Sequence, residues 1–210
     1  HGVGPMAISG LAITFPFMNL VMAFCTLVAG GGAALSSISL GRKDMNGATH
    51  ILGNTLMLCI INAVAFGSMA YLFLDDILLF FGASEITLPY ARDFMKVILI
   101  GTPISYIMIG LNNVMRATGY PKKAMLTSMV TVLGNIILAP IFIFYFKWGI
   151  QGAATATVIA QSIGMVWVLK HFTCSQSYVH LTRNFWRVDL GIVGRIFSIG
   201  MAPFLMNLCT

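Results

Sequence analysis

Charged residues are scarce in this chain and are missing from long parts of it. Asp, Glu, Lys and Arg make up 9% of the 210 residues, whereas 58% of the residues are hydrophobic. A typical soluble domain carries about 25% charged residues, so the composition excludes an ordinary water-facing surface. The stretches without any charged residue are 1–41, 45–74, 97–115, 124–146, 148–169 and 196–210.

Two other absences exclude common classes of protein. The four cysteines show no C-x-x-C spacing, and the four histidines stand at ends or connections, so neither a zinc site nor a metalloenzyme is indicated. The formal net charge is +6, but the basic residues are spread over several connections instead of forming one patch. Nucleic acid is therefore excluded as a partner.

The lengths of the uncharged stretches predict transmembrane helices. A membrane-spanning helix needs about 20 mostly apolar residues, whereas a membrane β-strand needs only about 9–11. Five stretches reach about the helical length, and the stretch at 196–210 stops short. We therefore predict an all-α polytopic membrane helical bundle, with five complete transmembrane helices and part of a sixth. The predicted helices cover 6–39, 46–74, 86–115, 122–146, 149–171 and 191–210.

Turn and cap residues support these boundaries. Ser84 is a suitable N-cap for the helix at 86–115. Gly119 followed by Pro121 predicts a stop and a new start, and residues 147–149 predict a tight reversal. The prolines inside predicted helices each remove a backbone hydrogen bond and favour a kink, and they are Pro16, Pro103 and Pro140.

The positions of Lys and Arg predict the orientation in the membrane. The connections at 42–45, 116–123 and 170–195 are rich in basic residues, whereas the other two connections carry more acids than bases. By the positive-inside rule the basic connections lie in the cytoplasm, so His1 lies outside. The expected location is the cell inner (cytoplasmic) membrane.

This orientation also predicts how the chain is organised. If a parent protein starts in the cytoplasm, an odd number of helices precedes His1, and one is the simplest number, so we expect a fragment of a longer protein. Residues 1–171 are predicted to form an N-terminal bundle that lacks its first helix. Residues 172–190 are the most polar connection and are predicted to be a cytoplasmic linker between bundles. Residues 191–210 would begin the first helix of a C-terminal bundle.

The polar groups at membrane depth are amides and hydroxyls, because no complete predicted helix has a charged residue at its centre. Intramembrane polar residues are costly and are candidates for function, although many only bridge helices or bond their own helix. Thr157 and Gln161 are four residues apart and share a helical face. Asn135 lies at a similar depth to Thr157, on the other side of the reversal at 147–149. These residues predict a polar cavity.

Four motifs together resemble the multidrug and toxic compound extrusion (MATE) family of transporters. AGGGAALSSISLG at 29–41, followed by Arg42-Lys43-Asp44, resembles the end of the family's second helix. NNVMRATGYP at 112–121 resembles the end of the fourth helix, and NIILAP at 135–140 resembles the fifth. GIQGAATAT at 149–157 resembles the start of the sixth. The resemblance implies helices two to seven of a twelve-helix exporter built from two bundles.

The resemblance also implies a cation site in the first bundle. Asn112, Asn135 and Thr157 match polar positions of that site on the fourth, fifth and sixth helices. Ala139 stands where the family has an Asp, so the coupling carboxylate is missing from these residues. Coupling through a first-helix carboxylate or through the second bundle stays open. We expect Asn112, Asn135, Thr157 and Gln161 to face the substrate or cation cavity.

The implied function is a Na⁺- or H⁺-coupled antiporter that exports drugs or other organic cations by alternating access. We expect no enzyme activity, no cofactor beyond the coupling ion, small cationic substrates, and a monomer when full length. One alternative is a lipid-linked oligosaccharide flippase of the same superfamily, which would place basic residues in its cavity. The other is an integral-membrane enzyme, for which no nucleophile, base or metal set is evident at membrane depth.

Overall fold

The structure is a computed structural model that describes residues 5–174, 177–183 and 187–209. The predicted outside position of His1 lies beyond these residues. The described chain is helical throughout its regular elements, in the order α1 (Pro5–Gly41), α2 (Met45–Leu72), α3 (Leu74–Phe80), α4 (Leu88–Ala117), α5 (Pro121–Pro140), a π-helix (Ile141–Tyr145), α6 (Gly149–Thr173) and α7 (Leu190–Leu208). The predicted all-α fold is confirmed.

Six helices of the described residues are long and apolar enough to cross a membrane. They are α1, α2, α4, α5 with its π-helical end, α6 and α7. The last of these, expected only in part, has 19 residues between Leu190 and Leu208. The chain is therefore a multi-pass membrane protein.

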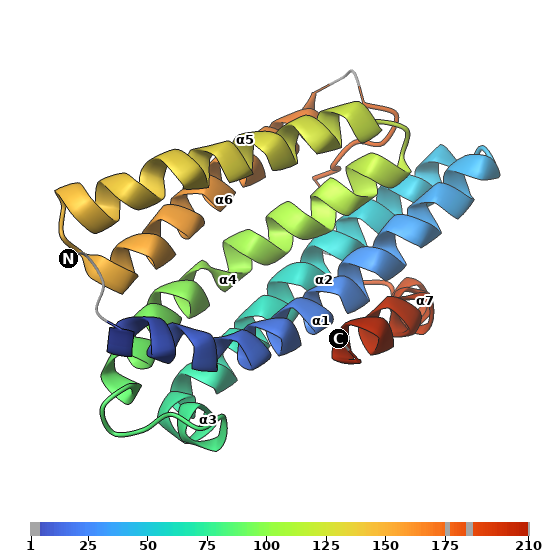
Figure 1. Ribbon diagram of the computed structural model, residues 1–210. Helices are drawn as coiled ribbons and strands as arrows, with labels where there is room; N and C mark the ends of the chain where they lie inside the picture. Colours follow the sequence, from blue (N-terminus) through green and yellow to red (C-terminus); the bar gives the residue numbers. More distant parts are fainter. Residues whose placement is uncertain (1–4, 175–176, 184–186, 210) are drawn as a thin grey trace.

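The helices form a bundle in which α4 is central. It packs against α1 and α2 on one side and against α6 and α5 on the other. Figure 1 shows α5 and α6 side by side along one flank, with α7 beside α1 at the opposite flank. The main apolar core lies among α1, α2 and α4 and includes Phe17, Val28, Met95 and Tyr106. A second cluster around Leu52, Leu111 and Phe172 joins α2, α4 and α6.

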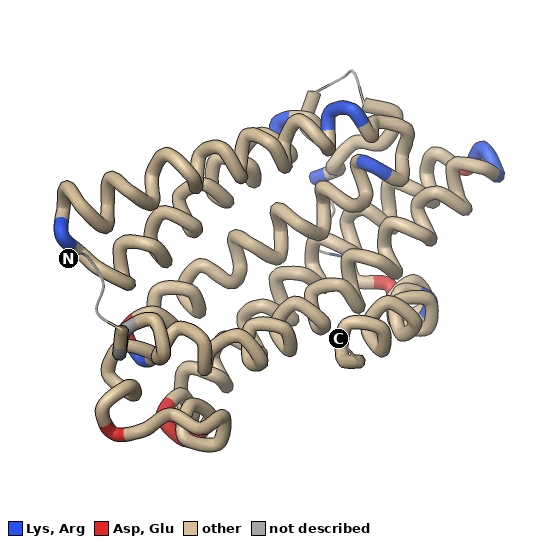
Figure 2. The backbone as a smooth tube through the Cα atoms, in the orientation of Figure 1, with Lys and Arg blue, Asp and Glu red and all other residues tan. Residues whose placement is uncertain are grey.

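Charged residues gather at the two ends of this bundle (Figure 2). The end that holds the α1–α2 and α4–α5 turns is mostly basic, and the end that holds α3 carries acids. The apolar lengths of the helices lie between the two ends, which is the arrangement that a lipid bilayer requires.

Most predicted turns and breaks have a visible physical cause. Gly119 adopts φ +96° before α5 starts at Pro121, while Lys147 (φ +56°) and Gly149 (φ +58°) make the tight reversal. Pro140 has no N–H to continue the α-helix, and the chain passes into a π-helix directly after it. α1, which contains Pro16, changes direction partway along in Figure 1.

Two boundaries differ from the predictions near the acidic end. The helix expected over 46–74 breaks at Phe73 and continues as the separate short α3. Ser84 does not cap α4, because it forms a turn with Thr87 in which Ser84 N donates to Thr87 Oγ1 at 3.0 Å. Thr87 is the N-cap residue, so α4 begins at Leu88, close to Pro89. Local hydroxyl bonding therefore delays the helix by about two residues.

Candidate functional site

The predicted polar residues lie where α4, α5 and α6 meet, and each of them bridges two helices. Asn135 Nδ2 of α5 donates to Thr157 Oγ1 of α6 at 2.8 Å. Asn112 Nδ2 of α4 donates to Ser128 Oγ of α5 at 3.0 Å. The hydroxyl of Ser105 on α4 donates to Oε1 of Gln161 on α6. Each of the three helix pairs is thus joined by at least one polar contact.

The Asn135–Thr157 contact is the pair that the sequence placed at one depth. Thr157 also donates to the Ala153 carbonyl oxygen of its own helix at 3.0 Å, so its hydroxyl hydrogen is used and its oxygen accepts from Asn135. Both side chains are half-buried. Close approach of α5 and α6 allows this contact, because an added Cβ on Gly134 would lie 3.7 Å from Cβ of Ala160.

Gln161 and Thr157 share a face of α6 as predicted, but they contact different neighbours. Thr157 reaches α5, whereas Gln161 reaches Ser105 on α4. The α4–α6 contact is tight near this point, because a Cβ on Gly101 would overlap the side chain of Val158. The structure therefore divides the predicted cluster between two interfaces.

Asn112 is the most deeply buried of the four residues, with 6% of its surface exposed. Its Nδ2 atom contacts Ser128, and Ser128 in turn donates to the Ala124 carbonyl oxygen at 3.2 Å. The Oδ1 atom of Asn112 is buried and has no hydrogen-bond partner in the described residues. A buried amide oxygen without a donor is costly and is a natural acceptor for a water or a ligand.

The chemistry of this region is that of neutral oxygens and amides. No Asp or Glu occurs between Asp93 and Asp189, so most of α4 and all of α5 and α6 lack a carboxylate. Amide and hydroxyl oxygens can contribute to a shell around Na⁺, but they cannot carry a proton at ordinary pH. Ala139, one turn beyond Asn135, is half-buried and supplies no ligand. Among the described residues, no group of three or more His, Cys, Asp or Glu side chains is placed to hold a metal ion.

Sequence reasoning missed the two serines that complete these contacts. Ser105 and Ser128 are the partners of Gln161 and Asn112, and both also bond carbonyls of their own helices. The only available signal was their presence in the uncharged stretches 97–115 and 124–146. Spacing within one helix cannot show which residue of another helix a hydroxyl meets.

Known proteins resemble this chain in sequence and in fold. The multidrug export protein MepA of Staphylococcus haemolyticus (strain JCSC1435) is 28% identical over 199 residues, which are 95% of this chain and 44% of that protein. MepA of Staphylococcus aureus (strain NCTC 8325 / PS 47) is 27% identical over 205 residues, or 96% of this chain and 45% of that protein. The chain thus spans less than half the length of these relatives.

The solved structures agree in fold. A multidrug resistance MATE family transporter of the MOP superfamily in an inward-facing conformation superposes with a TM-score of 0.92 at 24% identity, covering 98% of this chain and 47% of that one. A structure described as the outward-facing conformation of such a transporter gives a TM-score of 0.92 over 99% of this chain and 46% of that one. The family profile described as MatE matches residues 1–141, which is more than half of the chain. The chain therefore belongs to the MatE family.

Proposed function

We propose that this chain forms part of a cation-coupled antiporter that exports small, mostly cationic organic compounds from the cytoplasm by alternating access. The contact between Asn135 and Thr157, at the polar junction of α4, α5 and α6, is the observation that carries this proposal. It places an amide and a hydroxyl at membrane depth, in a protein whose relatives include multidrug export proteins. Polar groups held there are costly, which favours a role in binding.

The role that we propose for this polar junction in ion coupling follows from the absence of charged side chains there. Asn112, Asn135, Thr157 and Gln161 supply neutral oxygen and nitrogen atoms that can orient a cation or a substrate. The coupling carboxylate then lies outside the region from 94 to 188, which contains no acid. Either Na⁺ or H⁺ is compatible with this division of roles.

The charge distribution favours export of cations over transfer of a lipid-linked oligosaccharide. A pyrophosphate group would need basic residues at membrane depth. The described Lys and Arg lie in connections or near helix ends, and α5 and α6 carry none at their centres. A pathway of this composition does not repel a cationic substrate.

Efflux by the intact protein tests this proposal. Cells that express the protein are loaded with ethidium, and the rate of dye loss is compared between the unchanged protein and the variants Asn135→Ala and Thr157→Ala. We expect each variant to lose at least half of the efflux rate at equal expression. Thr155→Ala is the matched control, because among the described residues the Thr155 hydroxyl bonds just the Gln151 carbonyl oxygen of its own helix, at 2.7 Å. Efflux that is unchanged in Asn135→Ala would remove this residue from the mechanism.

A further inference from the structure

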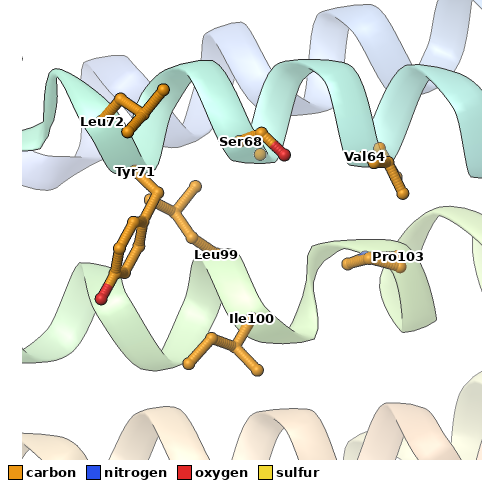
Figure 3. A pocket seen from close by; sticks show the side chains of 9 residues that line it. Val64, Ser68, Tyr71, Leu72, Leu99, Ile100 and Pro103 are labelled. Atoms are coloured by element: carbon orange, nitrogen blue, oxygen red, sulfur yellow. The ribbon is translucent and has the colours of Figure 1, made fainter.

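An open pocket lies between α2 and α4, away from the polar junction described above (Figure 3). Its volume is about 590 Å³, and its walls are mainly apolar, with Val64 and Gly67 from α2 and Leu99 and Pro103 from α4. Figure 3 shows Tyr71 and Val64 pointing from α2 toward α4. Ile100 is 73% exposed at its rim, so the pocket is open at the surface of the described bundle.

A second pocket of about 440 Å³ adjoins the first at the acidic end of the bundle. Tyr71 and Leu72 line both pockets, so the two pockets are neighbours at these residues. The second pocket is lined by charged residues of both signs, and these are Asp75, Asp76, Arg92 and Lys96.

The charges of this second pocket are only partly neutralised within the protein. Arg92 holds Asp75 through two contacts, from Nε to Oδ1 at 2.7 Å and from Nη2 to Oδ2 at 2.6 Å. No ion pair involves Lys96 or Asp76 within the described residues. One ammonium group and one carboxylate are therefore left to face the same small space.

The two pockets lie at successive depths in the membrane. Leu72 ends the apolar span of α2, and Asp75 and Asp76 lie in the first turn of α3 just beyond it. On α4, Arg92 and Lys96 precede Leu99 and Pro103, so charge gives way to apolar surface over about 10 Å of helix. The combined site is charged at the edge of the bilayer and apolar inside it.

We infer that this site binds one zwitterionic phospholipid with a primary ammonium headgroup, of the phosphatidylethanolamine type. Lys96 would hold the phosphate, and Asp76 would accept hydrogen bonds from the headgroup ammonium. One acyl chain would lie in the apolar pocket against Gly67, Leu99 and Pro103. A headgroup without an ammonium would leave Asp76 unpaired, so phosphatidylglycerol fits this pair of charges less well.

Filling the apolar pocket gives the first test. An added Cβ on Gly67 meets only the Leu99 carbonyl oxygen, at 3.7 Å, so the side chain of Gly67→Leu would extend into the pocket. Gly194→Leu is the control, because a Cβ there meets nothing within 4 Å. Native mass spectrometry of the intact purified protein, with phosphatidylethanolamine added, measures the retained lipid. We expect at least a fivefold loss of the tightly held lipid in Gly67→Leu and no change in Gly194→Leu.

Removing the headgroup contact gives a second test that leaves the core unchanged. Lys96→Gln should lower phosphatidylethanolamine retention by about two- to fivefold, the size expected for one partly exposed ion pair. Lys147→Gln, at the turn between α5 and α6, should have no effect. Phosphatidylglycerol and phosphatidylcholine should be retained more weakly than phosphatidylethanolamine. Equal retention of the three lipids, or retention that neither Gly67→Leu nor Lys96→Gln lowers, would overturn the inference.

Discussion

Single polar side chains inside these helices are paired in two ways. Hydroxyls donate to a carbonyl one turn back, as Thr102 does to Ile98 at 3.0 Å and Thr131 does to Thr127 at 2.9 Å. Some amides reach another helix, as Asn62 Nδ2 does when it donates to the Phe24 carbonyl oxygen at 3.1 Å. Lipid offers no hydrogen bonds, so each pairing removes a cost that the membrane would otherwise impose. In the Asn135–Thr157 contact, the hydroxyl donates to a carbonyl of its own helix and the amide reaches another helix.

The energy of that contact can be measured with a double-mutant cycle. Asn135→Ala and Thr157→Ala should each lower the stability of the purified protein by about 0.5–1 kcal/mol, the usual size of a hydrogen bond between membrane helices. Because both variants remove the same contact, the double variant should lose less than the sum of the two. Thermal unfolding in detergent provides the measurement. Strict additivity of the two losses would contradict a direct contact.

At this scale the sequence predicted both members of the Asn135–Thr157 pair and one member of each of the other two pairs. The depth of Asn135 and Thr157 followed from their distances to the turn at 147–149, and the contact between them agrees with that. The partners Ser105 and Ser128 did not follow, because the rotation of α4 and α5 about their axes depends on packing. The role of these residues in a cation or substrate cavity stays a prediction.

Among the elements, α1 and α7 make the closest crossing. A Cβ on Gly31 would overlap the Ile196 carbonyl group, and a Cβ on Gly200 would overlap that of Leu27. Asn207 Nδ2 of α7 also donates to Thr26 Oγ1 of α1 at 3.1 Å. Small residues at such crossings let backbones touch, which is a main source of helix association in membranes.

Adding one methyl group to this crossing should push the helices apart. Gly200→Ala should destabilise the protein by about 1–3 kcal/mol, the usual cost of overpacking. Gly194→Ala lies on the same helix and should be neutral or slightly stabilising, because its added Cβ has open space and Ala favours helix. Thermal unfolding of both variants in detergent checks this. Equal midpoints would show that α1 and α7 are not in contact.

The start of α7 is also held by specific contacts. Asp189 N donates to Asn54 Oδ1 of α2 at 2.8 Å, and Asp189 Oδ1 accepts from Gly191 N at 2.8 Å. The predicted division into a bundle at 1–171, a linker at 172–190 and a second bundle from 191 stays a prediction. The structure adds a hydrogen bond between the linker and α2, at the point where α7 begins.

Asn54→Ala should remove the hydrogen bond that connects the linker to α2. The variant leaves the backbone N–H of Asp189 without its acceptor, which costs about 1–2 kcal/mol when water cannot replace it. We expect faster proteolysis of the 172–190 connection and little change in the stability of the remaining bundle. Limited proteolysis followed by mass spectrometry locates the cuts, with Thr49→Ala on the same helix as the control. Identical cleavage rates in Asn54→Ala and the unchanged protein would count against this role of the hydrogen bond.

For the whole molecule, the separation of charge between the two ends is the dominant feature (Figure 2). Basic connections at 42–45 and 116–123 meet at one end, and α3 with its acids lies at the other. Tyr145 and Trp148 lie at the turn between α5 and α6 and are 80% and 51% exposed, as expected of aromatic residues at a membrane surface. The proposed orientation places the basic end in the cytoplasm.

Thiol labelling of whole cells tests this orientation. Cys174 and Cys209 are exposed, whereas Cys25 and Cys59 are buried. In a Cys209→Ser background, a membrane-impermeant maleimide should label Cys174 only after the cells are permeabilised. With Cys174 also replaced by Ser, the variant Lys147→Cys should be labelled in intact cells. The reverse pattern would invert the proposed topology.

The sequence by itself determined that this is an all-helical membrane protein, and it predicted the order of the helices and the side of each connection. Those properties depend on local transfer of uncharged stretches into lipid and on Lys and Arg in the connections, which a single chain displays directly. Only the tertiary structure decided that Asn112 bonds Ser128, that α1 touches α7 at glycine, and that the charged and the apolar pocket share Tyr71 in their walls. Such contacts depend on how each helix is rotated against its neighbours, and that is settled by packing across the whole bundle.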